Sequence, residues 1–221
     1  MKPEVAAVIF DLDGTLIDSL DDLADSVNTA LAEHGLPIHP AEPYNYFVGD
    51  GMETLVRRAA PEGTPSDVLT SIFARAKAEY GKNWAAKTKP YQGIVPMLER
   101  LVALGIPLAV LSNKPHEFTE EVVTWFFPDT PFAVVQGSPV GGKAKPEPGM
   151  ALAVAKKFDL KPERIAFMGD TRTDMDTAVN AGMLPIGVLW GFRPEQELLE
   201  HGAKVLLVKP DDLFYRVTVG N

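Results

Sequence analysis

Short apolar runs that alternate with helical patterns most strongly constrain the fold of this chain. Between these runs, residues 95–104, 116–126, 149–158 and 174–181 have the apolar spacing of helices. The runs, each expected to form a buried strand, are Val5–Phe10, Ile106–Leu111, Phe132–Val135, Arg164–Met168, Leu184–Leu189 and Lys204–Val208. Strands joined by helical crossovers lie parallel in one sheet, with helices on both faces. We therefore expect an α/β fold with a doubly wound parallel sheet.

Residues 20–87 form a long stretch in which we expect no strand. Leu20, Leu23, Val27 and Leu31 recur at helical spacing, and further helical patterns cover about residues 52–60 and 65–84. This segment therefore has the pattern of an inserted helical module. We expect a helical domain at residues 18–87 and an α/β core domain formed by residues 1–17 and 88–221.

Composition excludes several classes of function. Among 221 residues there are 21 Lys and Arg against 30 Asp and Glu, a net charge of −9. An acidic chain without a basic stripe is a poor nucleic-acid binder, so we expect no such partner. With no cysteine, disulfides, thiolate catalysis and zinc–thiolate sites are excluded. The first apolar run is too short for a signal peptide and no window approaches a membrane span, so we expect a cytoplasmic protein without a membrane partner. We expect it to be a monomer or a homodimer.

Two aspartates, Asp11 and Asp13, end the first apolar run and are followed by Gly14 and Thr15. Packing gives no reason to end a buried strand with two carboxylates. Two such charges repel unless a cation lies between them or one keeps a proton. The pair therefore suits a nucleophile and an acid/base at the carboxyl end of a strand, where open α/β sheets bind their ligands.

Other predicted strands also lead to polar residues. These are Ser112, Asn113 and Lys114 after the second run, Lys143 and Lys145 in the glycine-rich loop from Gly142 after the third, and Asp170 and Asp174 after the fourth. In a parallel sheet these ends converge on one edge. Three carboxylates there, Asp11, Asp170 and Asp174, need a hard divalent cation, and all-oxygen ligands favour Mg²⁺.

This set of groups fits phosphoryl transfer. The metal and a lysine would remove the repulsion between a carboxylate and a phosphate monoester. Donors from Thr15, Ser112 and Asn113 would bind the remaining phosphate oxygens. Asp11 would attack phosphorus to form an aspartyl phosphate, and Asp13 would protonate the leaving oxygen and then deprotonate the hydrolytic water. The substrate class is therefore a small-molecule phosphate ester.

The same residues resemble the four motifs of the haloacid dehalogenase superfamily of phosphatases, in that family's order. The matching segments are DLDGTLIDS (11–19), LSNK (111–114), AKPEP (144–148) and GDTRTD (169–174). The helical segment after the first motif resembles the C1-type cap of this superfamily. The resemblance runs from about Val5 to Val208.

The resemblance implies a role for each matching residue. Asp11 becomes the nucleophile and a metal ligand, and Asp13 the acid/base, which also binds the metal through its backbone carbonyl. Ser112 becomes a phosphate ligand and Asp170 a metal ligand. Asp174 either binds the metal directly or lies just outside its ligands. It would also fit as the N-cap of the following helix.

Two further assignments carry alternatives. Lys143 and Lys145 both precede the prolines, and we choose Lys145 as the catalytic lysine because it stands directly before Pro146. Ser112 and Asn113 would also serve as caps for the following helix, which is compatible with binding phosphate there.

The segment Phe47–Leu55 resembles the cap loop of phosphoglycolate phosphatases. Gly49 and Gly51 allow close backbone approach, and a helix that begins near Met52 presents N–H groups suited to a small carboxylate. We therefore expect these two glycines to bind substrate in a phosphoglycolate phosphatase. The alternatives are a phosphosugar mutase similar to β-phosphoglucomutase, another small-molecule phosphatase or pyrophosphatase, and a non-catalytic binder.

Overall fold

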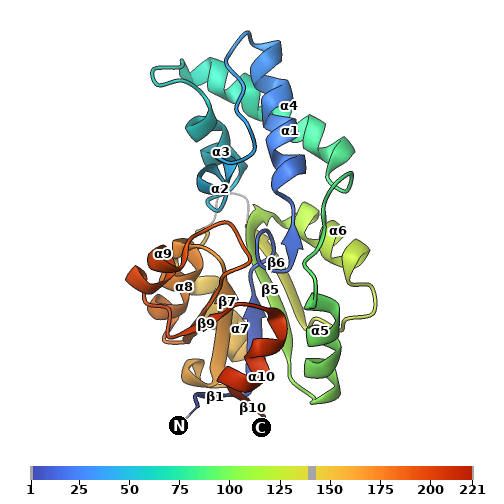
Figure 1. Ribbon diagram of the computed structural model, residues 1–221, viewed down its shortest axis with the longest axis vertical. Coiled ribbons are helices and arrows are strands. Elements are labelled where there is room, and N and C mark those ends of the chain that lie inside the picture. The colour runs from blue at the N-terminus through green and yellow to red at the C-terminus, as the bar shows by residue number, and fades with distance from the viewer. Residues whose placement is uncertain (1, 139–142, 221) are drawn as a thin grey trace. The chain divides into compact units, whose positions relative to one another are not determined.

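The computed structural model describes residues 2–138 and 143–220 (Figure 1). The chain forms two compact units, one made of residues 1–16 and 90–221 and the other of residues 17–89. We refer to them as the α/β unit and the helical unit. Gly142, at the start of the predicted glycine-rich loop, lies outside the described residues.

A six-stranded parallel sheet forms the centre of the α/β unit, with strand order β6-β5-β2-β7-β8-β9. Its strands are β2 (Ala7–Phe10), β5 (Leu108–Pro115), β6 (Val134–Ser138), β7 (Ile165–Gly169), β8 (Leu184–Val188) and β9 (Val205–Leu207). A separate parallel pair joins β1 (Glu4–Val5) to β10 (Thr218–Val219). The prediction of a doubly wound parallel α/β fold is confirmed.

Helices flank this sheet on both sides (Figure 1). They are α5 (Ile94–Ala103), α6 (His116–Phe126), α7 (Gly149–Lys157), α8 (Arg172–Ala181), α9 (Glu195–Glu200) and α10 (Leu213–Arg216). Ile9, Leu111 and Phe167 belong to a buried cluster that includes side chains of α7 and α8. Val8 and Phe10, on the opposite face of β2, are also fully buried. Both faces of the sheet are therefore covered, which explains the continuous apolar runs in the sequence.

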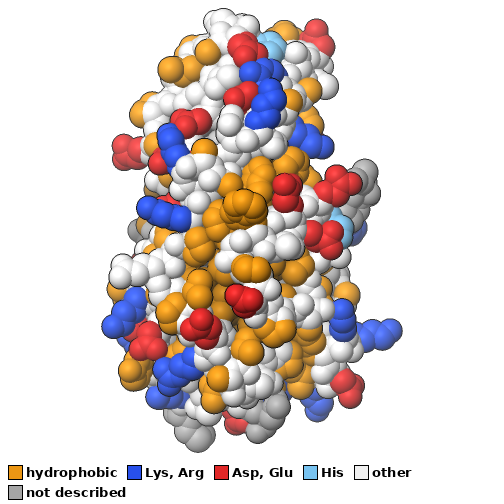
Figure 2. Space-filling model, turned by 90° about the vertical axis from the view of Figure 1, so that its right-hand side faces the viewer, with side chains coloured by type: hydrophobic (Ala, Val, Ile, Leu, Met, Phe, Trp, Pro, Cys, Tyr) orange, Lys and Arg blue, Asp and Glu red, His pale blue; other side chains and the backbone are white. Residues whose placement is uncertain are grey.

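The surface of the molecule mixes side-chain types. Figure 2 shows hydrophobic side chains among acidic and basic ones on the face that it displays. Trp125, in α6, is 67% exposed and is the most exposed tryptophan of the chain. It therefore contributes little to the core of the α/β unit.

The helical unit contains α1 (Leu20–Glu33), α2 (Tyr44–Phe47), α3 (Met52–Ala59) and α4 (Ser66–Asn83), and α1 packs along α4. The two ends of the segment pair with each other, because β3 (Ile17–Asp18) and β4 (Lys89–Pro90) form a two-stranded sheet. Next to this sheet, the buried Asp22 carboxylate accepts hydrogen bonds from the backbone N–H groups of Lys87 and Thr88 and from the Thr88 hydroxyl. Asp22 thus ties the first turn of α1 to the returning chain.

The structure corrects one strand boundary that affects the site. The prediction that the second strand ends at Leu111 is wrong, because β5 continues to Pro115. From Leu111 to Pro115 the strand advances four residues while its partner β6 advances two, from Gln136 to Ser138. This irregular pairing places polar residues inside the strand without disturbing the regular ladder before it.

Candidate active site

Three buried carboxylates meet at the carboxyl edge of the sheet. Asp11 follows β2, Asp170 follows β7, and Asp174 lies in the first turn of α8. Each offers an oxygen within 4.8 Å of the others, and all three residues are buried. The adjacency of β2 and β7 in the sheet creates this cluster from residues that lie far apart in the sequence.

Asp170 is fully buried and its two oxygens have separate partners. The Thr15 hydroxyl donates to Oδ1 at 3.2 Å, and the Phe192 backbone N–H donates to Oδ2 at 2.8 Å. Gly14 has φ +90°, and a Cβ there would lie 2.3 Å from Asp170 Oδ2. A Cβ at Gly191 would lie 2.2 Å from the Asp170 Cβ. Two glycine backbones therefore enclose this carboxylate.

Asp174 combines a structural contact with a position facing the cluster. Its Oδ2 accepts hydrogen bonds from the Thr171 backbone N–H at 3.0 Å and the Thr171 hydroxyl at 2.8 Å, within a capping box of α8. Asp174 is thus the third residue of the helix, and Thr171 is the N-cap. The other oxygen, Oδ1, lies 2.7 Å from the Lys145 ammonium. The capping box holds the Asp174 carboxylate in place, so its Oδ1 stays directed at Lys145.

Lys145 is a cation in direct contact with the cluster. Its Nζ lies 2.6 Å from Asp11 Oδ1 and 2.7 Å from Asp174 Oδ1, and its side chain is 2% exposed. The Asn113 side chain holds the lysine backbone: Oδ1 accepts from the Lys145 N–H at 2.9 Å, and Nδ2 donates to the Lys145 carbonyl at 3.2 Å. Lys143, by contrast, is exposed and pairs with Glu147 at 3.4 Å. The Asn113 contact was not expected from the sequence.

Burial shapes the electrostatics of these groups. Burial and the Asp174 carboxylate raise the pKa of Asp11 to about 7, although the Lys145 ammonium lowers it. Burial and the carboxylates of Asp11 and Asp174 also raise the pKa of Asp170. Burial lowers the pKa of Lys145, but Asp11 and Asp174 more than offset this and raise it overall. The lysine therefore stays charged, while Asp11 and Asp170 are harder to ionise than exposed aspartates.

This donor set fits a hard divalent cation. One buried ammonium neutralises only part of the charge of three ionised carboxylates, and a further positive charge among them would favour their ionised forms. The ligand atoms are all oxygens, which favours Mg²⁺ over softer metals. Asp11, Asp170 and Asp174 are the residues that would hold such an ion.

Asp13 contacts a second lysine that the sequence did not assign to any role. Lys114 Nζ lies 2.9 Å from both Asp13 Oδ1 and Asp13 Oδ2, and the two side chains are 5% and 13% exposed. Lys114 directly follows Ser112 and Asn113, and this position in the motif was the available signal. Its partner lies 101 positions away in the sequence, so the pairing itself could not be derived.

The remaining predicted site residues divide between the two units. Ser112 is buried in β5, and its Oγ accepts the Lys114 backbone N–H at 3.1 Å. Gly49 and Gly51 belong to the helical unit, with φ of +121° and +84°, and Gly51 immediately precedes α3. The α/β unit thus brings together all predicted site residues except these two glycines.

The comparisons with known proteins agree with this geometry. A sequence model described as haloacid dehalogenase-like hydrolase matches residues 8–188, most of the chain. The chain belongs to this family. The matched range includes the carboxyl ends of β2, β5, β6 and β7.

Relatives of this haloacid dehalogenase-like hydrolase carry a common name. Phosphoglycolate phosphatase of Haemophilus influenzae (strain 86-028NP) is 34% identical over 199 residues, covering 87% of this chain and 89% of the relative. The protein of the same name from Mannheimia succiniciproducens is 35% identical with the same coverage. A crystal structure described as a predicted phosphoglycolate phosphatase from Haemophilus somnus 129pt has a TM-score of 0.89 at 29% identity, covering 96% of this chain and 97% of that one.

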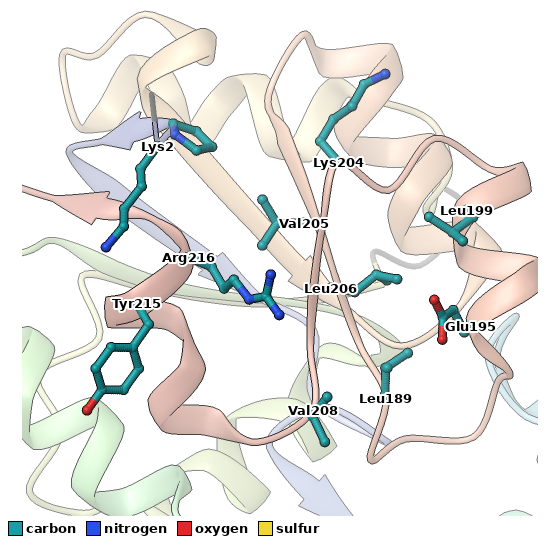
Figure 3. Close-up of a pocket in the computed structure, with 11 residues that line it drawn as sticks. Lys2, Leu189, Glu195, Leu199, Lys204, Val205, Leu206, Val208, Tyr215 and Arg216 are labelled. Carbon is teal, nitrogen blue, oxygen red and sulfur yellow. The ribbon is translucent and has the colours of Figure 1, made fainter.

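A groove lies elsewhere on this haloacid dehalogenase-like hydrolase, at the edge strand β9 (Figure 3). Its volume is about 880 Å³, and Leu189, Leu206 and Tyr215 are among its lining residues. The described residues that line it include none of the predicted site residues. No helix among residues 2–138 and 143–220 is long and apolar enough to cross a membrane.

Proposed function

We propose that this protein is a Mg²⁺-dependent phosphomonoester hydrolase that works through an aspartyl phosphate. One observation carries the proposal: Asp11 lies at the end of β2 with Lys145 Nζ 2.6 Å from its Oδ1, inside a buried group that includes Asp170 and Asp174. A carboxylate nucleophile needs positive charge beside it to accept an anionic phosphoryl group. Lys145 supplies part of that charge.

The proposed reaction has two halves. In the first, an Asp11 oxygen forms a bond to phosphorus while the bond to the ester oxygen breaks, and Asp13 gives that oxygen its proton to release the alcohol. In the second, water attacks the phosphorus of the aspartyl phosphate and gives a proton to Asp13. The bond between phosphorus and the Asp11 oxygen breaks, so the Asp11 carboxylate is restored and inorganic phosphate leaves.

Individual residues support these two halves. Lys145 stabilises negative charge that develops on the phosphoryl oxygens. The Asn113 side chain holds Lys145 in place through hydrogen bonds to the backbone of the lysine. Ser112 and Thr15 provide hydroxyl groups for the phosphate. A bound Mg²⁺, held by Asp11, Asp170 and Asp174 with the Asp13 carbonyl, would supply Lewis-acid stabilisation of the same charge.

The most specific form of this proposal is hydrolysis of 2-phosphoglycolate to glycolate and phosphate. Relatives at 34% and 35% identity carry the name phosphoglycolate phosphatase. In the helical unit, Arg58 supports the loop before α3 by donating to the Phe47 carbonyl at 3.1 Å and pairing with Asp50. We propose that residues 18–87 act as a specificity cap and that Gly49 and Gly51 of this loop bind the carboxylate end of the substrate.

A substrate panel tests the reaction. Purified protein is assayed with Mg²⁺ for phosphate release from phosphoglycolate, sugar phosphates, nucleotides and pyrophosphate, and again with EDTA. We expect the highest kcat/KM for phosphoglycolate and loss of turnover in EDTA. Asp11→Asn should abolish turnover and keep the circular dichroism spectrum. Near-normal turnover of Asp11→Asn would remove Asp11 as the nucleophile. Transfer of phosphate between sugar positions, with dependence on a bisphosphate activator, would indicate a mutase instead.

A second experiment tests the loop. Gly51 has φ +84° and Gly63 has φ +81°, so valine at either position strains the backbone by about 1–3 kcal/mol. Gly63 lies in an exposed turn of the same unit with open space around its Cβ direction, so Gly63→Val is a matched control. We expect Gly51→Val to lower kcat/KM for phosphoglycolate well beyond the control. Equal values for the two variants would refute the assignment of the loop.

A further inference from the structure

Asp13 and Lys114 form an ion pair separate from the one that Lys145 makes. The Lys114 ammonium is 2.9 Å from each Asp13 oxygen, whereas Lys145 contacts Asp11 and Asp174. The Lys114 side chain is 5% exposed, so little water competes for this contact. A cation placed equally against both oxygens restricts rotation of the carboxylate about its last torsion angle.

The backbone of Lys114 is itself fixed. Its N–H donates to Ser112 Oγ at 3.1 Å, and its carbonyl accepts from Thr119 Oγ1 at 3.2 Å. On β6, a Cβ at Gly137 would lie 2.5 Å from the Lys114 carbonyl oxygen and 2.4 Å from Thr119 Oγ1. The irregular end of β5 therefore packs directly on a glycine backbone. This close packing fixes the backbone position from which the Lys114 side chain extends.

We propose that Lys114 is a positioning residue that aims the Asp13 carboxylate for both of its proton transfers. The proposal rests on the function proposed above, in which Asp13 moves the proton. Proton transfer requires the acid within hydrogen-bond reach of the reacting oxygen, and misplacement by about 1 Å costs on the order of 100-fold in rate. When one Asp13 oxygen carries the proton, the other still accepts a hydrogen bond from Lys114. Lys114 therefore holds the Asp13 carboxylate in the same orientation in both protonation states.

The leaving group distinguishes this role from a general structural one. Glycolate is a poor leaving group and needs protonation, whereas p-nitrophenolate leaves readily without it. The value of kcat/KM reports only the steps through transfer to Asp11 if that transfer is irreversible. For Lys114→Met we expect kcat/KM to fall about 100-fold or more with phosphoglycolate but less than about 10-fold with p-nitrophenyl phosphate.

The two kinetic constants give a second signature. Hydrolysis of the aspartyl phosphate also uses Asp13, so Lys114→Met should slow this second step. A slower second step lowers kcat and KM for p-nitrophenyl phosphate together. Lys114→Arg keeps a cation and should recover part of the phosphoglycolate activity. Lys143→Met is the matched control, because Lys143 is an exposed lysine of the same unit that contacts Glu147. Its constants should match those of the wild type.

A double-variant cycle guards against misfolding. If Lys114 acts through Asp13, then Lys114→Met should change kcat/KM little in an Asp13→Asn background. That background also removes the carboxylate that Lys114→Met would leave, at 13% exposure, without this lysine. A similar loss on both substrates, or an undiminished effect in the Asp13→Asn background, would overturn the proposal. Wild-type protein that releases phosphate from neither substrate would instead refute the proposed function, and the inference with it.

Discussion

Replacing Asp22 should destabilise the helical unit far more than replacing another carboxylate on the same helix. In Asp22→Ala, the Thr88 N–H and hydroxyl lose acceptors at 2.8 and 2.7 Å, and the Lys87 N–H loses contacts at 2.9 and 3.1 Å. Thr88 is 6% exposed, so water does not readily replace its partners. Lys87 is exposed, and its N–H finds water at small cost.

The size of this effect follows from the two Thr88 bonds. Hydrogen bonds to a charged group contribute about 1.5–3 kcal/mol each. Removing the carboxylate also removes the cost of burying it, which offsets part of the loss. We therefore expect the free energy of unfolding to fall by about 2–4 kcal/mol, a large share of the ~5–15 kcal/mol typical of a domain.

Asp25→Ala is the matched control. Asp25 lies one turn further along α1 and pairs with the Lys87 ammonium at 2.7 Å, with side chains 61% and 53% exposed. An exposed pair of this kind contributes about 0–1 kcal/mol. Urea unfolding gives the free energies, and amide exchange of α1 and α4 peptides locates the change. A loss in Asp22→Ala no larger than in Asp25→Ala would refute the reasoning.

Three further predictions concern the active site. Burial and Asp174 raise the pKa of Asp11 from 3.8 to about 7, so the folded metal-free protein binds this proton more tightly than the unfolded chain. Its contribution to stability is therefore lost as the pH rises from about 4 through 7. In urea unfolding, the stability of Asp11→Asn relative to wild type should rise over that range, and a constant difference would contradict the shift. Gly14→Ala places a Cβ 2.3 Å from Asp170 Oδ2 at a φ of +90°, so thermal unfolding with and without Mg²⁺ should show a lower midpoint and a smaller Mg²⁺-induced rise; an unchanged rise would mean that Asp170 does not hold the ion. Lys145→Met should lower kcat for phosphate release by at least about 100-fold, whereas Lys143→Met should leave it unchanged; similar losses in both would refute the role of the buried lysine.

The general architecture was predictable because most strands of the sheet contain a continuous apolar run. Both faces of the sheet are covered, so Val8 and Ile9 are equally buried and the run is visible without any periodicity. Polar residues at the ends of β2 and β7 then indicated the carboxylate cluster, since parallel strands end at one edge. The pairing of β2 with β7 brings Asp11 and Asp170 together.

Contacts that depend on register or on side-chain direction could not be predicted. The strand β5 continues past Leu111 through an irregular pairing with β6, and the polar residues Ser112 to Lys114 gave no indication that the strand would continue. Lys114, whose ammonium contacts Asp13, lies within this irregular stretch. Asp22 has the sequence position of an ordinary acidic residue in the first turn of a helix, and its partners are more than 60 residues away.

The pairing of β3 with β4 bears on how such a protein can change over time. Residues 17–18 and 89–90 lie side by side, so the helical segment leaves and re-enters the chain at neighbouring points. A segment whose ends already meet adds little loop-closure entropy to the fold that hosts it, whatever its own length. Such a segment is suited to exchange as a cassette between related chains, because a new insert needs only two adjacent ends to be accommodated. On the proposed role of residues 18–87 as a specificity cap, new substrate preferences can arise by recombination at two short strands, while the buried carboxylates of the α/β unit stay unaltered.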